Sequence, residues 1–171
     1  AWSAPSPARR TAAPGARPTL DGVSFTADPG QHVAFVGPSG AGKTTVLYLT
    51  PRMYEASGGS VLFAGADVRH LTQESIIDSV GIVSQETYLF HATIRENLRL
   101  ALQSRHGGGR DAWRDVDRYE EVNTQTAELL RFLGLEGIED TLGGDLSYGG
   151  QRLVDLGIAL GSRPEVLLLD E

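Results

Sequence analysis

The sequence predicts an α/β fold in which a strand-rich core carries an inserted, mainly helical segment. Strand-like patterns dominate residues 20–85, helical periodicity dominates residues 86–162, and an apolar strand-like run returns at the end of the chain. A glycine-rich loop at residues 37–42 joins a predicted strand to a predicted helix. The 21 glycines in total suit an α/β protein with many tight turns.

Composition limits the classes of function. The 171 residues make one ordinary domain, and 40% apolar residues are enough for a core. The formal charge of −7 gives no electrostatic case for nucleic acid as a partner. The absence of cysteine excludes disulfides, thiolate metal sites and cysteine nucleophiles, and the four histidines are scattered. No apolar run approaches the ~18 residues that span a bilayer, so a membrane role would act through a partner or another part of the chain.

The two ends of the chain suggest a fragment. Residues 1–19 are rich in Ala, Pro and Arg without the apolar core of a signal peptide, so we expect a flexible leader or linker there. The folded domain is expected over residues 20–171. The sequence has no initial Met, and Glu171 follows directly on a strand-like run.

The first elements are strands around the glycine-rich loop. Residues 23–27 and 32–36 alternate like two strands, with a turn at residues 28–30. The second strand enters the loop, and a helix then runs to about Thr50, where Pro51 stops it. Three further elements follow, namely a strand at 60–64, a short helix from about Gln73 with Thr72 as its N-cap, and an apolar strand at 80–84.

The helical segment begins where Thr93 and Glu96 form a capping box, which opens a helix to about Gln103. Three consecutive glycines within residues 105–110 indicate a loose loop. The apolar residues in 117–133 fall on one helical face, so a helix is expected there, and Gly134 ends it. A last amphipathic helix follows Gly149 and Gly150, is broken at residues 163–164, and leads to the buried-strand run Val166–Leu169.

The glycine-rich loop matches the phosphate-binding pattern G-x-x-x-x-G-K-[ST]. Its residues are Gly37-Pro38-Ser39-Gly40-Ala41-Gly42-Lys43-Thr44. Glycines let the backbone curl so that its N–H groups face phosphates, and the following helix adds its positive N-terminus. Lys43 would then reach the β- and γ-phosphates, and the Thr44 hydroxyl would bind Mg²⁺. A chance glycine-rich turn is disfavoured, because the motif follows a strand and opens a helix.

The last strand ends in two carboxylates, Asp170 and Glu171. In proteins with such a loop, an aspartate at this place holds Mg²⁺ and a following glutamate can polarise the attacking water. An ordinary strand with a charged end would be the preferred interpretation without the phosphate loop. With that loop in the same chain, the catalytic interpretation is favoured.

Two further motifs complete a pattern. The segment Leu146-Ser147-Tyr148-Gly149-Gly150-Gln151-Arg152 lies between the loop and the acidic strand, and Gln85 follows the strand at 80–84. In this order the motifs resemble the ATP-binding domain of ABC transporters, over about residues 20–171. The resemblance implies a P-loop NTPase core with an antiparallel β edge, a helical subdomain at about 86–160, and a chain that stops at the Walker B strand.

The resemblance also implies roles for individual residues. Gln85 resembles the glutamine that contacts Mg²⁺ and water, Asp170 the metal ligand, and Glu171 the catalytic base. Lys43 and Gln85 would assist Glu171 in catalysis. Two domains would close head-to-tail around two ATP, with the signature of one capping the γ-phosphate held by the other. The residues that resemble the ATP-cradling set are Gly37, Ser39, Gly40, Ala41, Gly42, Lys43, Thr44 and Thr45, and those that resemble the signature are Ser147, Gly149 and Gly150.

Three functions remain open at this point. The first is a transport ATPase on the cytoplasmic side of the membrane, working with fused or separate transmembrane permease domains. The second is an ABC protein of DNA repair or translation, which the −7 charge disfavours. The third is an incomplete nucleotide-binding module without turnover.

The chain also departs from the family pattern. The first half resembles exporter-type ATPases, and the second half resembles branched-chain amino-acid importer ATPases. Ala13 stands where the family has an adenine-stacking aromatic residue, so weak discrimination between ATP and GTP is expected. Gly150 stands where the family has Gln or Glu. The D-loop and switch histidine are missing from this chain, so we expect it to bind nucleotide but to hydrolyse it poorly.

Overall fold

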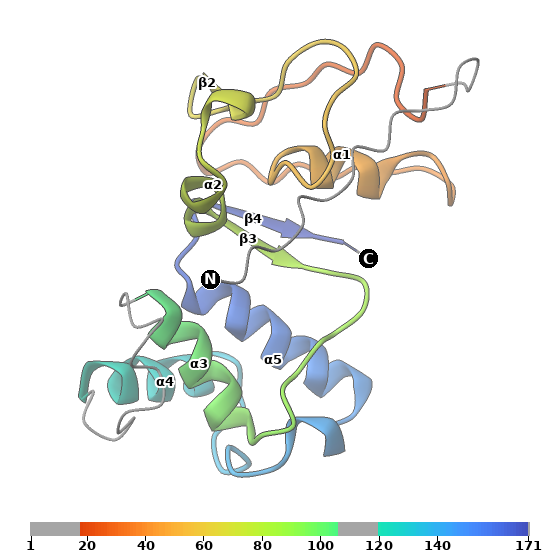
Figure 1. Cartoon of the computed structure of the whole chain (residues 1–171). Helices are drawn as coiled ribbons and strands as arrows, with labels where there is room; N and C mark the ends of the chain where they lie inside the picture. Colours follow the sequence, from red (N-terminus) through yellow and green to blue (C-terminus); the bar gives the residue numbers. More distant parts are fainter. Residues whose placement is uncertain (1–17, 106–119, 171) are drawn as a thin grey trace, which may run out of the picture.

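The computed structural model describes residues 18–105 and 120–170 (Figure 1). Its elements, in chain order, are α1 (Lys43–Leu49), β1 (Leu62–Phe63), β2 (Ala66–Asp67), the 3₁₀ helix η1 (Val68–His70), α2 (Gln73–Ser79), β3 (Val80–Val83), α3 (Ile94–Arg105), α4 (Glu120–Phe132), the 3₁₀ turn η3 (Gly143–Asp145), α5 (Tyr148–Gly161) and β4 (Val166–Leu169).

The centre of the fold is the parallel pair β3–β4. Val83 lies opposite Leu169, and the amide of Asp170 donates to the Val83 carbonyl at 2.9 Å. Helices α3, α4 and α5 come between these strands in sequence, so the chain crosses from one parallel strand to the next through a helical segment. Gly81 in β3 lets α5 approach closely, because a Cβ there would lie 3.2 Å from the Ala159 carbonyl. The α/β prediction is confirmed.

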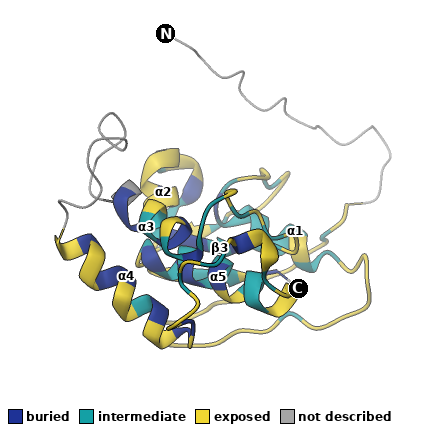
Figure 2. Cartoon of the chain, turned by 90° about the horizontal axis from the view of Figure 1, so that it is seen from below, coloured by how far each residue is buried: buried dark blue, intermediate teal, exposed yellow. Residues whose placement is uncertain are grey.

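Helices α3, α4 and α5 pack around one apolar cluster (Figure 2). The buried face of α4 includes Val122, Thr126 and Leu130, at helical spacing, while most of its other residues are exposed. Gly157 in α5 lies under the neighbouring helices, because a Cβ there would meet Leu133 Cδ1 at 2.5 Å. The buried residues of the cluster are Ile94, Leu98, Leu130, Leu133, Leu135 and Val154.

Two helix starts agree with the predicted caps. Thr72 Oγ1 accepts from the Ser75 amide at 3.2 Å before α2. At α3, Thr93 Oγ1 accepts from the Glu96 amide at 3.2 Å, and Glu96 Oε2 accepts from the Thr93 amide at 2.8 Å. This reciprocal pair is the predicted capping box. Residues 106–119, which include most of the predicted loop and the predicted start of α4, lie outside the described part of the chain.

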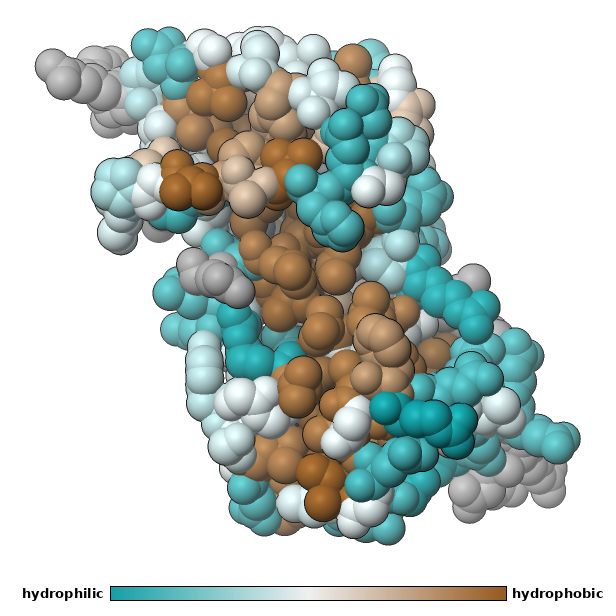
Figure 3. Space-filling view, turned by 180° about the vertical axis from the view of Figure 1, so that it is seen from behind, coloured by the Kyte–Doolittle hydropathy of each residue, from teal (hydrophilic) through white to brown (hydrophobic). Residues whose placement is uncertain are grey.

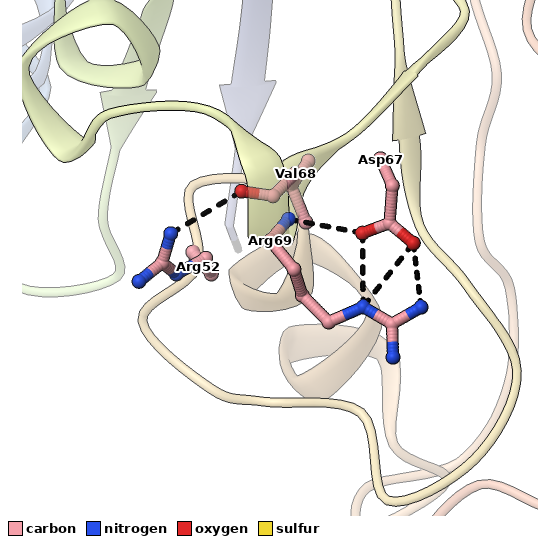
Figure 4. A network of polar contacts seen from close by, with 4 residues as sticks. All are labelled: Arg52, Asp67, Val68 and Arg69. Carbon is pink, nitrogen blue, oxygen red and sulfur yellow. Dashed lines mark hydrogen bonds and ion pairs between the residues drawn. The ribbon is translucent and has the colours of Figure 1, made fainter.

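The antiparallel edge is a short hairpin, β1–β2, in which Phe63 pairs with Ala66. Each of its strands has two residues, so the strand predicted at 60–64 is shorter in the structure and covers only Leu62–Phe63. After the hairpin, Asp67 caps η1 and accepts a forked contact from Arg69 (Figure 4). Arg52, just beyond α1, donates to the Val68 carbonyl at 3.3 Å and so links the end of α1 to η1.

The strands predicted at residues 23–27 and 32–36 are not formed, which corrects the prediction. The turn between them is present, with the Gln31 amide donating to the Asp28 carbonyl at 3.0 Å. The rings of Phe25 and Phe35 meet edge to face, with centroids 4.9 Å apart. Apolar alternation alone does not make a strand, which also needs a hydrogen-bonded ladder and a surface to pack against. Val36, for example, is 94% exposed.

Apolar side chains form a band across the face shown in Figure 3. Several large hydrophobic residues are exposed in the described part of the chain, among them Val36 at 94% and Phe90 at 64%. Within residues 18–105 and 120–170, no helix has both the length and the apolarity needed to cross a membrane.

Candidate functional site

The glycine-rich loop is built by two residues with left-handed backbone angles, Gly40 at φ 79° and Gly42 at φ 88°. Side chains other than glycine rarely adopt these angles. The Ala41 amide donates to the Pro38 carbonyl at 3.2 Å, which closes the turn. A Cβ on Gly42 would also lie 3.3 Å from the Thr19 carbonyl oxygen, so limited space as well as backbone angle favours glycine there. Helix α1 begins directly after the loop, at Lys43.

Lys43 folds back over the loop that precedes it. Its Nζ donates to the Gly37 carbonyl at 2.8 Å and to the Pro38 carbonyl at 2.9 Å. An ammonium group has three donors, so one remains for an anion at the mouth of the loop. The positive N-terminus of α1 lies at the same place, where it favours a phosphate group.

Thr44 and Asp170, 126 residues apart in sequence, meet directly. Thr44 Oγ1 donates to Asp170 Oδ1 at 2.9 Å, and Asp170 is only 6% exposed. This bond joins the phosphate loop to the carboxyl end of β4, as the motif order predicts. It also excludes a fold in which Lys43 and Asp170 lie on opposite faces.

The donor set fits Mg²⁺. A hydroxyl and a carboxylate oxygen are hard ligands, and Mg²⁺ is commonly held by one or two carboxylates together with substrate phosphates and water. Among the described residues no cluster of three or more His, Cys, Asp or Glu side chains could hold a metal by itself. Thr44 and Asp170 therefore suit a cation that arrives with a phosphate-bearing ligand.

Tyr48 was not singled out by the sequence, yet it belongs to this site. It lies one helical turn after Thr44 on α1. Burial raises the pKa of Tyr48, and the negative charge of Asp170 together with a hydrogen bond to its side chain raises it further. The i, i+4 spacing from Thr44 was the signal that could have placed Tyr48 on the same face.

Gln85 lies just beyond the carboxyl end of β3, and its side chain is exposed. Because Val83 and Leu169 are opposite each other, Gln85 follows β3 at the edge of the sheet where Asp170 follows β4. The segment after Gln85 is held locally, since Tyr88 Oη donates to Glu86 Oε2 at 2.5 Å. Gln85 and Asp170 therefore lie at the same edge of the β3–β4 pair.

The signature segment starts helix α5. Ser147 Oγ accepts from the Gly150 amide at 3.3 Å and caps the helix. Ser147 and Gly149 are exposed. Figure 1 shows α5 and α1 on opposite sides of the β3–β4 pair. Within one chain, the signature is thus not brought next to the phosphate loop.

Arg152 is a second residue that motif reasoning left without a role. It lies in α5 and reaches the ends of both central strands. Its Nη2 donates to the Asp170 carbonyl at 3.2 Å, and its Nη1 donates to the Ser84 carbonyl. No spacing rule in the sequence indicated this contact, because it depends on the crossing of α5 beneath the strands. Glu171 and Ala13 lie outside the described residues, so their roles remain predictions.

A glycine-rich loop at a helix N-terminus, with a strand-borne aspartate bound to the hydroxyl after its lysine, defines a P-loop nucleotide-binding protein. The family model described as "ABC transporter" matches residues 20–171, and the chain belongs to this family. It is an ATP-binding domain of the ABC ATPase type.

Relatives and a solved structure agree with this assignment. The chain is 37% identical over 158 residues to the uncharacterized ABC transporter ATP-binding protein YfiC of Bacillus subtilis, covering 90% of this chain and 24% of the relative. It is 38% identical over 161 residues to the Beta-(1-->2)glucan export ATP-binding/permease protein NdvA of Bradyrhizobium diazoefficiens, covering 92% and 25%. The chain therefore spans about a quarter of these relatives.

The dimeric ATP-binding cassette MJ0796, solved in a post-hydrolysis state with ADP and Pi, has a TM-score of 0.73 to this chain. The sequences are 26% identical, and the match covers 90% of this chain and 66% of that one. The resemblance of the second half to importer ATPases is not addressed by these similarities and remains a prediction.

Proposed function

We propose that this chain binds Mg²⁺-ATP in its phosphate loop and, paired with a second copy or a related domain, hydrolyses ATP to drive a membrane transporter. The observation that carries the proposal is the 2.9 Å bond between Thr44 Oγ1 and Asp170 Oδ1. It unites the phosphate loop with a buried carboxylate at a strand end, where Mg²⁺ is held in P-loop proteins.

The proposed roles rest on the positions of the described groups and, for Glu171, on the family resemblance alone. The amides of the loop and the free donor of Lys43 would bind phosphate oxygens, and Thr44 and Asp170 would hold Mg²⁺. Gln85 would orient water at the same edge, and Glu171 would be the general base. The remaining residues of the proposed phosphate cradle are Gly37, Ser39, Gly40, Ala41, Gly42 and Thr45.

A second domain is part of the proposal, because one chain has its loop and its signature on opposite sides of β3–β4. Ser147, Gly149 and Gly150 would cap the γ-phosphate of ATP bound in the opposite domain, with the N-terminus of α5 facing the anion. The dimeric form of MJ0796 supports this arrangement.

The membrane partner is proposed on similar grounds. NdvA is an export ATP-binding/permease protein by name, and this chain matches a quarter of it. We propose that permease segments, fused or separate, place this chain at the cytoplasmic face of a membrane. The exposed rings of Tyr88 and Phe90, shortly after Gln85, offer apolar surface for such a contact.

The test is the substitution Lys43→Ala in titrations with a fluorescent ATP analogue and Mg²⁺. Loss of a charge-assisted contact to phosphate costs about 1.5–3 kcal/mol, so affinity is expected to fall about tenfold to a hundredfold. Arg131→Ala is the control, since Arg131 is exposed and its side chain forms a surface ion pair with Glu136. Equal affinity of Lys43→Ala and the parent chain would show that the nucleotide does not bind at the phosphate loop.

A further inference from the structure

The side chain of Arg152 bridges the two central strands from below. It extends from α5 and donates from Nη1 to the Ser84 carbonyl and from Nη2 to the Asp170 carbonyl, the latter at 3.2 Å. Both acceptors are main-chain groups at the carboxyl ends of β3 and β4. Arg152 therefore contacts the site through the backbone, and not through the Asp170 carboxylate.

The geometry of the strands explains why an arginine suits this place. Val83 lies opposite Leu169, so Ser84 and Asp170 are the next pair along the two strands. Neighbouring strands lie about 4.8 Å apart. The planar guanidinium presents donors in a fixed fork and can span two acceptors at this separation, whereas an ammonium group is a single point of charge.

Each backbone group that Arg152 contacts belongs to, or is next in sequence to, a residue with a proposed function. Gln85 follows Ser84, and the Asp170 side chain accepts from Thr44. On its own helix, Arg152 lies over the ring of Tyr148, with the guanidinium carbon 5.9 Å from the ring centre. Tyr148 follows Ser147, the residue that caps α5. The Arg152 side chain thus contacts both the start of α5, where the signature lies, and the carboxyl ends of β3 and β4.

We propose that Arg152 is a positioning residue that fixes the start of α5 relative to the strand ends carrying Gln85 and Asp170. This inference rests on the proposed Mg²⁺-ATP site and adds a role for a residue outside it. A displacement of the signature helix moves the guanidinium, and with it the backbone that sets the Asp170 carboxylate. A change in the position of the signature is then accompanied by a change in the position of the proposed metal ligand Asp170.

The first experiment separates metal binding from phosphate binding. ATP affinity is measured with excess EDTA and again over a Mg²⁺ titration, for the parent chain, Arg152→Ala, Arg152→Lys and the charge-matched control Arg131→Ala. Residues that orient metal ligands commonly change metal affinity 10- to 100-fold. Arg152→Ala is therefore expected to lower the affinity for Mg²⁺ by about 10- to 100-fold, while the affinity for ATP without metal stays unchanged. Arg152→Lys should recover part of the loss, and Arg131→Ala should match the parent.

A Mg²⁺ dependence in Arg152→Ala equal to that of the parent overturns the inference. If the parent itself shows no Mg²⁺-ATP binding, the proposed function fails, and the inference is then decided by a second measurement that needs no ligand. Amide hydrogen exchange in Arg152→Lys, a milder change should Arg152→Ala not fold, is expected to rise at residues 84–86 and 168–170 over the parent. Unchanged exchange at both strand ends would show that Arg152 positions neither of them.

Discussion

Single residues determine how well the phosphate site could be predicted. Lys43, Thr44 and Asp170 were predicted because their motifs are short and each position has a chemical reason. Tyr48 and Arg152 were not, since their contacts with Asp170 depend on how α1 and α5 lie against β4. The local pattern was therefore sufficient for groups within a motif, but not for groups that reach it across the fold.

At this scale the Thr44 hydroxyl gives a sharp prediction. Thr44→Val keeps the shape of the side chain but removes the donor to Asp170 and the proposed Mg²⁺ ligand. Mg²⁺ is expected to lose most of its effect on ATP affinity, while affinity measured in EDTA changes little. Isothermal titration with and without Mg²⁺ measures both. The matched control is Thr124→Val, which changes an exposed threonine whose hydroxyl donates to the Glu120 carbonyl within α4. An equal Mg²⁺ effect in Thr44→Val and the parent would remove Thr44 from the metal site.

Elements were predicted well where local chemistry decides them. The N-cap of α2, the capping box of α3 and the glycine after α4 were predicted correctly, since each depends on groups within a few residues. The strands at 23–27 and 32–36 were predicted wrongly, because a strand depends on a partner that the local pattern does not specify. The parallel pair β3–β4 was predicted as two strands, but their pairing and register join residues far apart in sequence, which a local pattern does not specify.

The capping box of α3 makes a pH prediction. The Thr93 backbone N–H and then its hydroxyl donate to Glu96 and lower the pKa of Glu96 below its ordinary value. Because the folded-state pKa is depressed, this contribution to stability is present above the ordinary pKa and is lost as pH falls through the lower, folded one. Thr93→Ala should raise the pKa of Glu96 part of the way back, and the loss of the cap should cost about 1 kcal/mol.

NMR titration of the Glu96 carboxyl, with urea unfolding at two pH values, measures both effects. The cost of Thr93→Ala should shrink at pH values below the folded pKa, where the carboxylate is protonated in both chains. Thr124→Ala serves as control, because that hydroxyl bonds within α4 and faces no carboxylate in the capping box. A Glu96 pKa that does not move in Thr93→Ala would contradict the assigned cause.

For the whole molecule, the proposed assembly follows from the separation of loop and signature across β3–β4 (Figure 1). We expect ATP with Mg²⁺ to favour a dimer in analytical ultracentrifugation. Ser147→Arg should abolish that dimer through bulk and charge at the exposed helix start, while one-to-one nucleotide binding by the single chain remains. Arg131→Glu, far from either motif in sequence, is the control for a change of surface charge. A dimer that forms equally with Ser147→Arg would mean that the signature does not lie at the interface.

The parallel pairing of β3 with β4 has a further consequence for the order of folding. These strands are joined by the whole segment from residue 84 to residue 165, and closing so long a connection costs chain entropy before any contact rewards it. The helices between them, whose contacts are more local, are expected to form earlier. Asp170 reaches Thr44 only when β4 docks beside β3. The proposed metal site is therefore expected to form late in folding, only once the chain has reached its native topology.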